Sequence, residues 1–133
     1  MNKQEWSEKL RMRGLKATQQ RLEILLLLKK ASKPIAVEEI FAQLKKSDLV
    51  TIYRNLTAFE KAGLVESSRL GTGRIHYELK QGHHHHHVIC TNCRSVMNLE
   101  LCGLESHMKA LAEMGYTSVS HHLEFYGHCK KCS

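Results

Sequence analysis

The segment Gly82-His83-His84-His85-His86-His87-Val88-Ile89-Cys90-Thr91-Asn92-Cys93 decides how this chain is organised, because it joins five consecutive histidines to two cysteines spaced for metal binding. A second pair with the same spacing follows at Cys129 and Cys132. Two such pairs supply the tetrahedral sulfur shell of a structural zinc site. Disulfides or free thiols are the alternative, but the chain shows no sign of export, which favours the metal. We predict that Zn²⁺ is bound by Cys90, Cys93, Cys129 and Cys132.

The histidine run predicts a second kind of metal chemistry. The apolar residues that lead into the first cysteine pair indicate an extended strand, and side chains alternate faces along a strand. Alternate histidines would then feed two different metal sites, one with His83, His85 and His87 and the other with His84 and His86. An affinity tag is the other interpretation of such a run, but here the flanking residues continue the fold.

The charge of the chain is uneven. Its 133 residues carry a formal net charge of +7. Residues 1–79 hold 15 Lys/Arg against 9 Asp/Glu, whereas residues 80–133 hold 5 against 4. A zinc ion on four thiolates would bring the second part to about −1. We therefore expect the basic first part to face a polyanion such as double-stranded DNA.

Length and hydropathy bound the class of protein. A chain of 133 residues makes one domain or two very small ones, and the metal-rich part has too little apolar sequence to be stable without its ion. No apolar run typical of a signal peptide is present, and Leu22–Leu28 is too short to span a membrane. We expect a soluble, cytoplasmic protein without a membrane partner.

The first part of the chain has the pattern of a winged helix-turn-helix domain. Four helices are expected: at about residues 2–13, from the N-cap Thr18 to Lys33-Pro34, at 37–46 and at 49–62. Residues 64–70 and 74–79 then form a β-hairpin around a turn at 71–73. A hairpin that follows helices in this way is typical of the wing.

The fourth helix has the composition of a recognition helix. Its apolar residues fall in one stripe, formed by Leu49, Ile52, Leu56 and Phe59. Arg54 lies opposite the stripe, Thr51 flanks it and Tyr53 sits at its border. These side chains can read base edges, so we predict that they contact DNA. A helical module that binds protein is the alternative.

The second part predicts a small α/β element. Strands are expected at 95–99 and 117–126, with a helix at 101–114 between them. An element of this size exposes its edges, so we expect a homodimer. The fifth cysteine, Cys102, has no partner at ligand spacing and is interpreted as a small buried apolar residue. The fold class is α+β, with a winged-helix domain at 1–79, a hinge at 80–82 and a metal-binding dimerisation domain at 83–133.

These residues resemble the ferric uptake regulator family of metal-dependent bacterial repressors. The likeness covers essentially the whole chain and rests on four segments, Gly14-Leu15-Lys16-Ala17-Thr18-Gln19-Gln20-Arg21, Thr51-Ile52-Tyr53-Arg54-Asn55-Leu56, residues 83–93 and Tyr126-Gly127-His128-Cys129. The resemblance implies a homodimer in which a regulatory metal closes the domains into a DNA-binding pose. It also implies that Tyr53 and Arg54 are the recognition pair and that Lys16 reaches toward the minor groove.

The same resemblance implies two regulatory metal sites. The site inside the dimerisation domain matches in full as His84, His86, Glu105 and His121. The site near the hinge matches as Glu78, His85 and His87, but Pro34 stands where the family has a histidine. Proline offers no ligand, so His76, Glu66 or water would have to complete that site.

We therefore expect a regulator of metal-homeostasis genes that binds palindromic DNA as a metal-loaded homodimer, without enzymatic activity or a small-molecule substrate. Imidazole and carboxylate ligands accept Fe²⁺, Zn²⁺ or Mn²⁺. Iron(II) is preferred because it is the commonest signal in the family, and a zinc uptake regulator is the alternative within it. A histidine-rich protein for metal storage or delivery is the alternative from another class.

Overall fold

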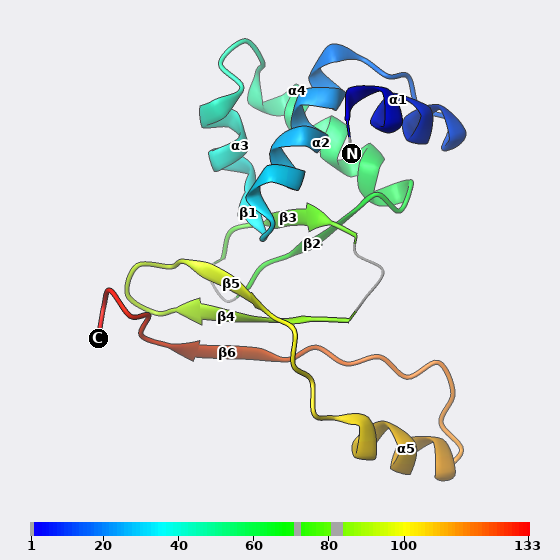
Figure 1. The fold of residues 1–133 in the computed structure, drawn as a ribbon, viewed down its shortest axis with the longest axis vertical. Helices are drawn as coiled ribbons and strands as arrows, with labels where there is room; N and C mark the ends of the chain where they lie inside the picture. The colour runs from blue at the N-terminus through cyan, green and yellow to red at the C-terminus, as the bar shows by residue number, and fades with distance from the viewer. Residues whose placement is uncertain (1, 71–72, 81–83) are drawn as a thin grey trace. The chain divides into compact units, whose positions relative to one another are not determined.

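The computed structural model describes residues 2–70, 73–80 and 84–133. The chain divides into two units, Met1–Lys80 and Gln81–Ser133, which are described separately below (Figure 1). This division falls within the predicted hinge at 80–82, of which only Lys80 belongs to the described residues. His83 and most of the predicted hairpin turn at 71–73 also lie outside them.

Side-chain caps begin three of the helices in the first unit. The unit contains α1 (Lys3–Met12), α2 (Gln19–Ala31), α3 (Val37–Gln43) and α4 (Leu49–Lys61). Asn2 accepts a hydrogen bond from the backbone of Glu5 at the start of α1, and Thr18 does the same for α2. Such caps satisfy backbone donors that the first turn of a helix leaves unpaired. The four predicted helices are confirmed, with α3 shorter than expected.

A small antiparallel sheet completes the first unit. It has the strand order β1-β3-β2, made of β1 (Ile35–Ala36), β2 (Val65–Ser68) and β3 (His76–Leu79). The β2–β3 hairpin confirms the predicted wing. The sequence gives no sign of β1, because two residues are too few to show alternation. Figure 1 shows the helices gathered on one side of this sheet, as expected for a winged helix.

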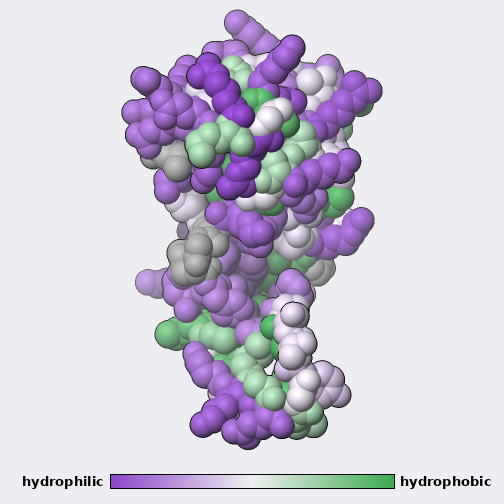
Figure 2. Space-filling model, turned by 90° about the vertical axis from the view of Figure 1, so that its right-hand side faces the viewer, coloured by the Kyte–Doolittle hydropathy of each residue, from purple (hydrophilic) through white to green (hydrophobic). Residues whose placement is uncertain are grey.

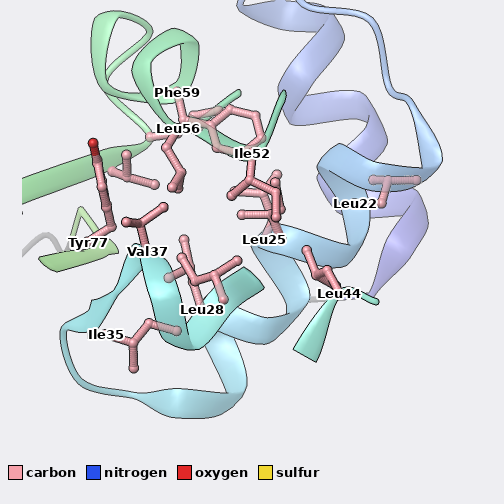
Figure 3. Packing of buried hydrophobic residues seen from close by; sticks show 14 of the residues in the cluster. Leu22, Leu25, Leu28, Ile35, Val37, Leu44, Ile52, Leu56, Phe59 and Tyr77 are labelled. Atoms are coloured by element: carbon pink, nitrogen blue, oxygen red, sulfur yellow. The ribbon is translucent and has the colours of Figure 1, made fainter. Parts of the chain in front are cut away.

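The core of the first unit lies where α4 meets the other helices and the sheet (Figure 3). Ile52, Leu56 and Phe59 are fully buried there, and each such side chain contributes about 1.5–3 kcal/mol through burial. Leu49 was predicted to continue this stripe, and that prediction is wrong, because its side chain is 42% exposed. The buried stripe of α4 therefore begins one turn after the helix starts.

The second unit is a three-stranded sheet with one helix. The elements are β4 (His86–Cys90), β5 (Val96–Leu99), α5 (Glu105–Glu113) and β6 (Glu124–Gly127). In the order β5-β4-β6, β4 pairs antiparallel with β5 and parallel with β6. The predicted helix at 101–114 and strand at 117–126 are both too long. Gly103 and Ser118 adopt positive φ angles, +70° and +54°, which regular helices and strands do not accommodate.

Few apolar side chains are buried in the second unit. Ile89 and Val96 are buried within its sheet, whereas every residue of α5 is exposed or half-buried. In Figure 1, α5 lies away from the sheet at the end of two long connections, and Figure 2 shows hydrophobic residues at the surface in this part of the unit. The exposed apolar side chains include Met97, Leu101, Met114, Tyr116, Phe125 and Tyr126. Each helix within residues 2–70, 73–80 and 84–133 is too short or too polar to span a bilayer.

Candidate metal centres and DNA-binding surface

The parallel pairing of β4 with β6 brings the two cysteine pairs together. Cys90 ends β4 opposite Gly127 of β6, so the turn after each strand carries the remaining cysteines to the same place. All four sulfurs lie within 4.8 Å of one another. The Sγ atoms of Cys93 and Cys129 are 3.7 Å apart, and sulfurs on a tetrahedral zinc at about 2.3 Å lie about 3.8 Å apart. The Cys90, Cys93, Cys129 and Cys132 cluster therefore fits a zinc site.

Backbone donors prepare this cluster for a cation. The N–H groups of Cys129 and Cys93 each donate to Cys90 Sγ over 3.4 Å. These two hydrogen bonds lower the pKa of Cys90 to about 5, because they favour the thiolate. A hydroxyl contact from Ser95 likewise lowers the pKa of Cys93. The thiols are free and not joined as disulfides, so they remain available as metal ligands.

Three imidazole nitrogens meet at a second place in the same unit. His84 Nε2 lies 2.9 Å from His86 Nε2 and 2.9 Å from His121 Nε2, and the latter two are 3.3 Å apart. Each Nε2 can offer only one proton or one lone pair, so three of them directed at one point do not satisfy one another by hydrogen bonds. Ligand nitrogens on a tetrahedral zinc lie about 3.3 Å apart, close to these distances. The three histidines can hold one divalent ion.

Burial suits His86 to ligation. Its side chain is only 3% exposed, and desolvation, followed by the neighbouring histidines, lowers its pKa. A lowered pKa keeps the imidazole neutral, which is the form that binds a metal.

The fourth donor beside these histidines differs from the prediction. Cys102 Sγ lies 3.3 Å from His86 Nε2 and 3.4 Å from His121 Nε2. The interpretation of Cys102 as a buried apolar residue is therefore wrong, since the residue is half-buried with its thiol at the histidine cluster. Glu105, predicted as the fourth ligand, is exposed at the start of α5 and is not part of the donor group. Cys102 has no second cysteine at short ligand spacing, so the sequence pattern gives no sign that its thiol is a metal ligand.

His85 and His87 lie apart from this cluster. The rings of His85 and His87 pack against each other with centroids 5.1 Å apart, whereas His84 packs on His86 with centroids 4.4 Å apart. The alternation along β4 and the residues before it separates the two pairs in this way.

The ligands predicted for the hinge site come from both units, so that site stays a prediction. Glu78 lies on β3 and is opposite Glu66 of β2. His76 is buried, and its Nδ1 contacts the carbonyl of Arg74 over 3.2 Å. Pro34 precedes β1 and supplies no ligand.

The predicted recognition residues lie on the first turns of α4. Asp48 caps this helix by accepting hydrogen bonds from the backbone and the hydroxyl of Thr51, at 2.8 and 2.9 Å. Tyr53 and Arg54 are exposed on the following turn. A surface depression runs along this side of the helix, lined by Leu49, Val50, Tyr53, Arg54 and Thr57. Apolar side chains beside an arginine suit thymine methyl groups and guanine edges.

A polar network fixes α2 against α4 under this surface. Arg21 donates through Nε to Asn55 Oδ1 over 3.0 Å and through Nη1 to the carbonyl of Lys16 over 3.0 Å. Asn55 donates in turn to Gln20. The network holds the loop that carries the exposed Lys16 close to the recognition helix. Gln20 and Arg21 are far from Asn55 along the chain, so the sequence pattern does not predict this network.

The first unit is a basic winged helix, and the second is an α/β unit that carries a four-cysteine cluster fit for zinc and a histidine cluster. Together they define a two-unit protein of the winged-helix class with candidate metal centres. A profile of the Ferric uptake regulator family matches residues 12–126. The chain therefore belongs to the ferric uptake regulator family.

Individual relatives agree over nearly the whole length. The chain is 36% identical over 129 residues to the ferric uptake regulation protein of Bordetella parapertussis, covering 92% of this chain and 93% of that protein. The structure of the Francisella tularensis ferric uptake regulator with iron is 34% identical with a TM-score of 0.77, covering 90% of this chain and 95% of the other. The structure of the Vibrio cholerae ferric uptake regulator is 32% identical with a TM-score of 0.81, and the match covers 92% of this chain and 98% of that one.

Proposed function

We propose that this protein is a metal-dependent transcriptional repressor of metal-homeostasis genes, which binds palindromic double-stranded DNA in the cytoplasm as a homodimer. The observation that carries the proposal is the combination, in one chain, of a winged helix with an exposed recognition face and a cluster of three converging imidazoles. In this account the protein is a regulator and not an enzyme.

The surface of α4 supports DNA binding. Arg54 and Tyr53 stand on its exposed side beside the exposed Leu49 and Val50, and these side chains line one surface depression, where a partner of matching shape could bury the apolar groups. A major groove rich in A·T pairs offers thymine methyl groups to such residues. Lys16 and the net positive charge of the first unit supply phosphate contacts.

The second unit supports dimerisation. β6 is an edge strand of its sheet, and its Phe125 and Tyr126 are exposed. A second copy of the chain would cover these residues and the apolar side chains around α5. Two winged helices related by a two-fold axis would then read the two halves of a palindrome.

The metal acts through linkage. If the DNA-binding arrangement of the two units binds the metal more tightly than other arrangements, the metal raises DNA affinity by the factor by which DNA raises metal affinity. We propose that the structural zinc stays bound throughout and that the regulatory ion exchanges. The regulatory ligands are His84, His86 and His121, with a hinge site formed by Glu78, His85 and His87.

Iron(II) is the proposed signal, because the relatives are named for ferric uptake and one solved structure contains iron. Zinc is the second candidate, since the thiol of Cys102 beside the histidines is a softer donor than a carboxylate. A metal-storage protein, the alternative from another class, would not need the exposed recognition face of α4.

The test is DNA binding as a function of free metal. Protein that retains its structural zinc is titrated with Fe²⁺ under anaerobic conditions, or with Zn²⁺ or Mn²⁺, in the presence of a palindromic A/T-rich duplex at fixed salt. We expect the chain to bind only when a metal is present and Fe²⁺ to act at the lowest free concentration. Metal uptake without a gain in DNA affinity would contradict the proposal and favour storage.

A further inference from the structure

We infer that Cys102 is the fourth ligand of the His84, His86 and His121 cluster, which makes this site a three-histidine, one-thiolate centre for a tetrahedral ion of the zinc type. The inference deepens the proposed function, on which it rests only in taking the histidine cluster as a metal site. The ligand atoms of this site determine which metal ion it prefers.

The distances place the sulfur at the position of a ligand. Cys102 Sγ is 3.3 Å from His86 Nε2 and 3.4 Å from His121 Nε2, and all four donor atoms lie within 4.8 Å of one another. A nitrogen and a sulfur on the same tetrahedral zinc, at about 2.0 and 2.3 Å, lie about 3.5 Å apart. The observed sulfur contacts therefore need little adjustment to enclose an ion.

The backbone brings Cys102 to the cluster and leaves Glu105 outside it. Gly103 has a φ of +70°, a conformation that other residues rarely adopt, and it turns the chain directly after Cys102. Glu105 begins α5 beyond this turn and is exposed in the first turn of the helix. A carboxylate at a helix N-terminus is stabilised by the helix dipole, so its presence there needs no metal.

The ligand set also ties α5 to the sheet. Cys102 lies on the connection from β5 to α5, and His121 lies on the connection from α5 back to β6. His86 is in β4, with His84 just before it. One ion on these residues fixes both connections to the central strand. The position of α5, whose own side chains bury little, then depends on the ion.

Thiolate ligation sets the choice of metal. Three imidazoles and one thiolate form a closed tetrahedral shell of borderline and soft donors, which favours Zn²⁺ over Mn²⁺. A carboxylate as the fourth ligand would accept Mn²⁺ and Fe²⁺ more readily. In this inference the histidine cluster is therefore specialised for zinc.

Cobalt(II) substitution tests the inference, because a sulfur ligand produces a charge-transfer absorption that nitrogen and oxygen ligands do not. Co²⁺ is titrated into full-length protein whose structural zinc is retained, with zinc content measured before and after. We expect a sulfur-to-cobalt band in the wild type, its loss in Cys102→Ser, and its retention in the matched control Glu105→Gln. Removal of a residue that only supports a metal ligand typically lowers metal affinity by roughly 10- to 100-fold. Cys102→Ser removes a ligand itself, so its Zn²⁺ affinity should fall by at least this factor.

The other outcomes are distinct. A cobalt spectrum that depends on His84 but is unchanged in Cys102→Ser, or that is lost in Glu105→Gln, would overturn the inference while leaving a metal site for the proposed function. No uptake of Co²⁺ or Zn²⁺ beyond the structural zinc would overturn the inference and the proposed function together. Circular dichroism of each variant establishes that it is folded.

Discussion

The two units of this protein differ in what stabilises each of them. The first unit buries a continuous cluster of apolar side chains contributed by all four helices and the small sheet. In the second unit Ile89, Cys90 and Val96 are the buried apolar residues among those described, and its polar His86 is as buried as they are. A unit with so little core depends on metal ions and a partner chain. We therefore expect the first unit to fold on its own core and the second unit to depend on what it binds.

Loss of the structural zinc should have the largest effect on this difference between the units. Replacing Cys129 with Ser should unfold the second unit, because structural zinc contributes an apparent free energy of about 10–16 kcal/mol in small domains. Hydrogen exchange should show that amides of β4, β5 and β6 lose protection while those of α2 and α4 keep it. Cys102→Ser is the control, since it leaves the four-cysteine site intact. Protected β4 amides in the zinc-free variant would mean that the second unit has a sufficient core of its own.

The opposite test acts on the core of the first unit. Phe59 is fully buried, so Phe59→Ala should lower the free energy of unfolding of this unit by about 3–5 kcal/mol. Phe41→Ala is the matched control, because Phe41 is 43% exposed and its loss should cost about 1 kcal/mol. Urea denaturation monitored in the first unit measures both, and bound zinc should not change. Equal costs for the two substitutions would contradict the assignment of the core.

A third experiment separates regulation from storage. Arg54→Ala should weaken binding to a preferred duplex by about 1–3 kcal/mol, because a base contact is lost, while metal content and stability stay the same. Fluorescence anisotropy at fixed salt gives the affinity. Arg11→Ala, at an exposed position in the last turn of α1, is the control and should have a much smaller effect. If both variants bound alike, α4 would not be the recognition helix.

The smallest expected effect concerns the cap of α4. The backbone and hydroxyl hydrogen bonds from Thr51 lower the pKa of Asp48. A lowered carboxylate pKa means that the cap contributes fully above the pKa of an unfolded aspartate and that this contribution is lost as the pH falls through the lowered value. Asp48→Asn keeps a capping oxygen without the charge, so its urea midpoint should fall less than that of the wild type below about pH 4. Parallel midpoints for the two proteins would show that this carboxylate does not couple to folding.

The sequence predicts the first unit better than the second for a physical reason. Helix caps such as Thr18 and Asp48 and the periodic apolar residues of α4 are local signals, and the structure follows them. The errors occur at residues whose burial is determined by tertiary contacts or by function. Leu49 has the spacing of a core residue but lies one turn beyond the packed part of the stripe, on the face proposed to meet DNA.

The metal centres show the same division between local and distant signals. Pairs of cysteines separated by two residues are recognisable in sequence, and the structure brings all four cysteines together. Cys102 and His121 lie far apart along the chain and meet through the two connections of α5, which no spacing rule anticipates. The positive φ angle of Gly103 turns the chain directly after Cys102, and a lone glycine in the sequence does not predict such a turn.

If metal in the second unit controls DNA binding by the first, the two binding events must be coupled reciprocally, and this coupling can be measured. Metal affinity is measured with and without the duplex, and DNA affinity is measured with and without the metal, in protein that keeps its structural zinc. Linkage requires the two ratios to be equal; we expect both to lie in the range of about 5–150-fold and His84→Ala to reduce both. DNA affinity that is the same with and without the regulatory metal would contradict control of DNA binding by the metal.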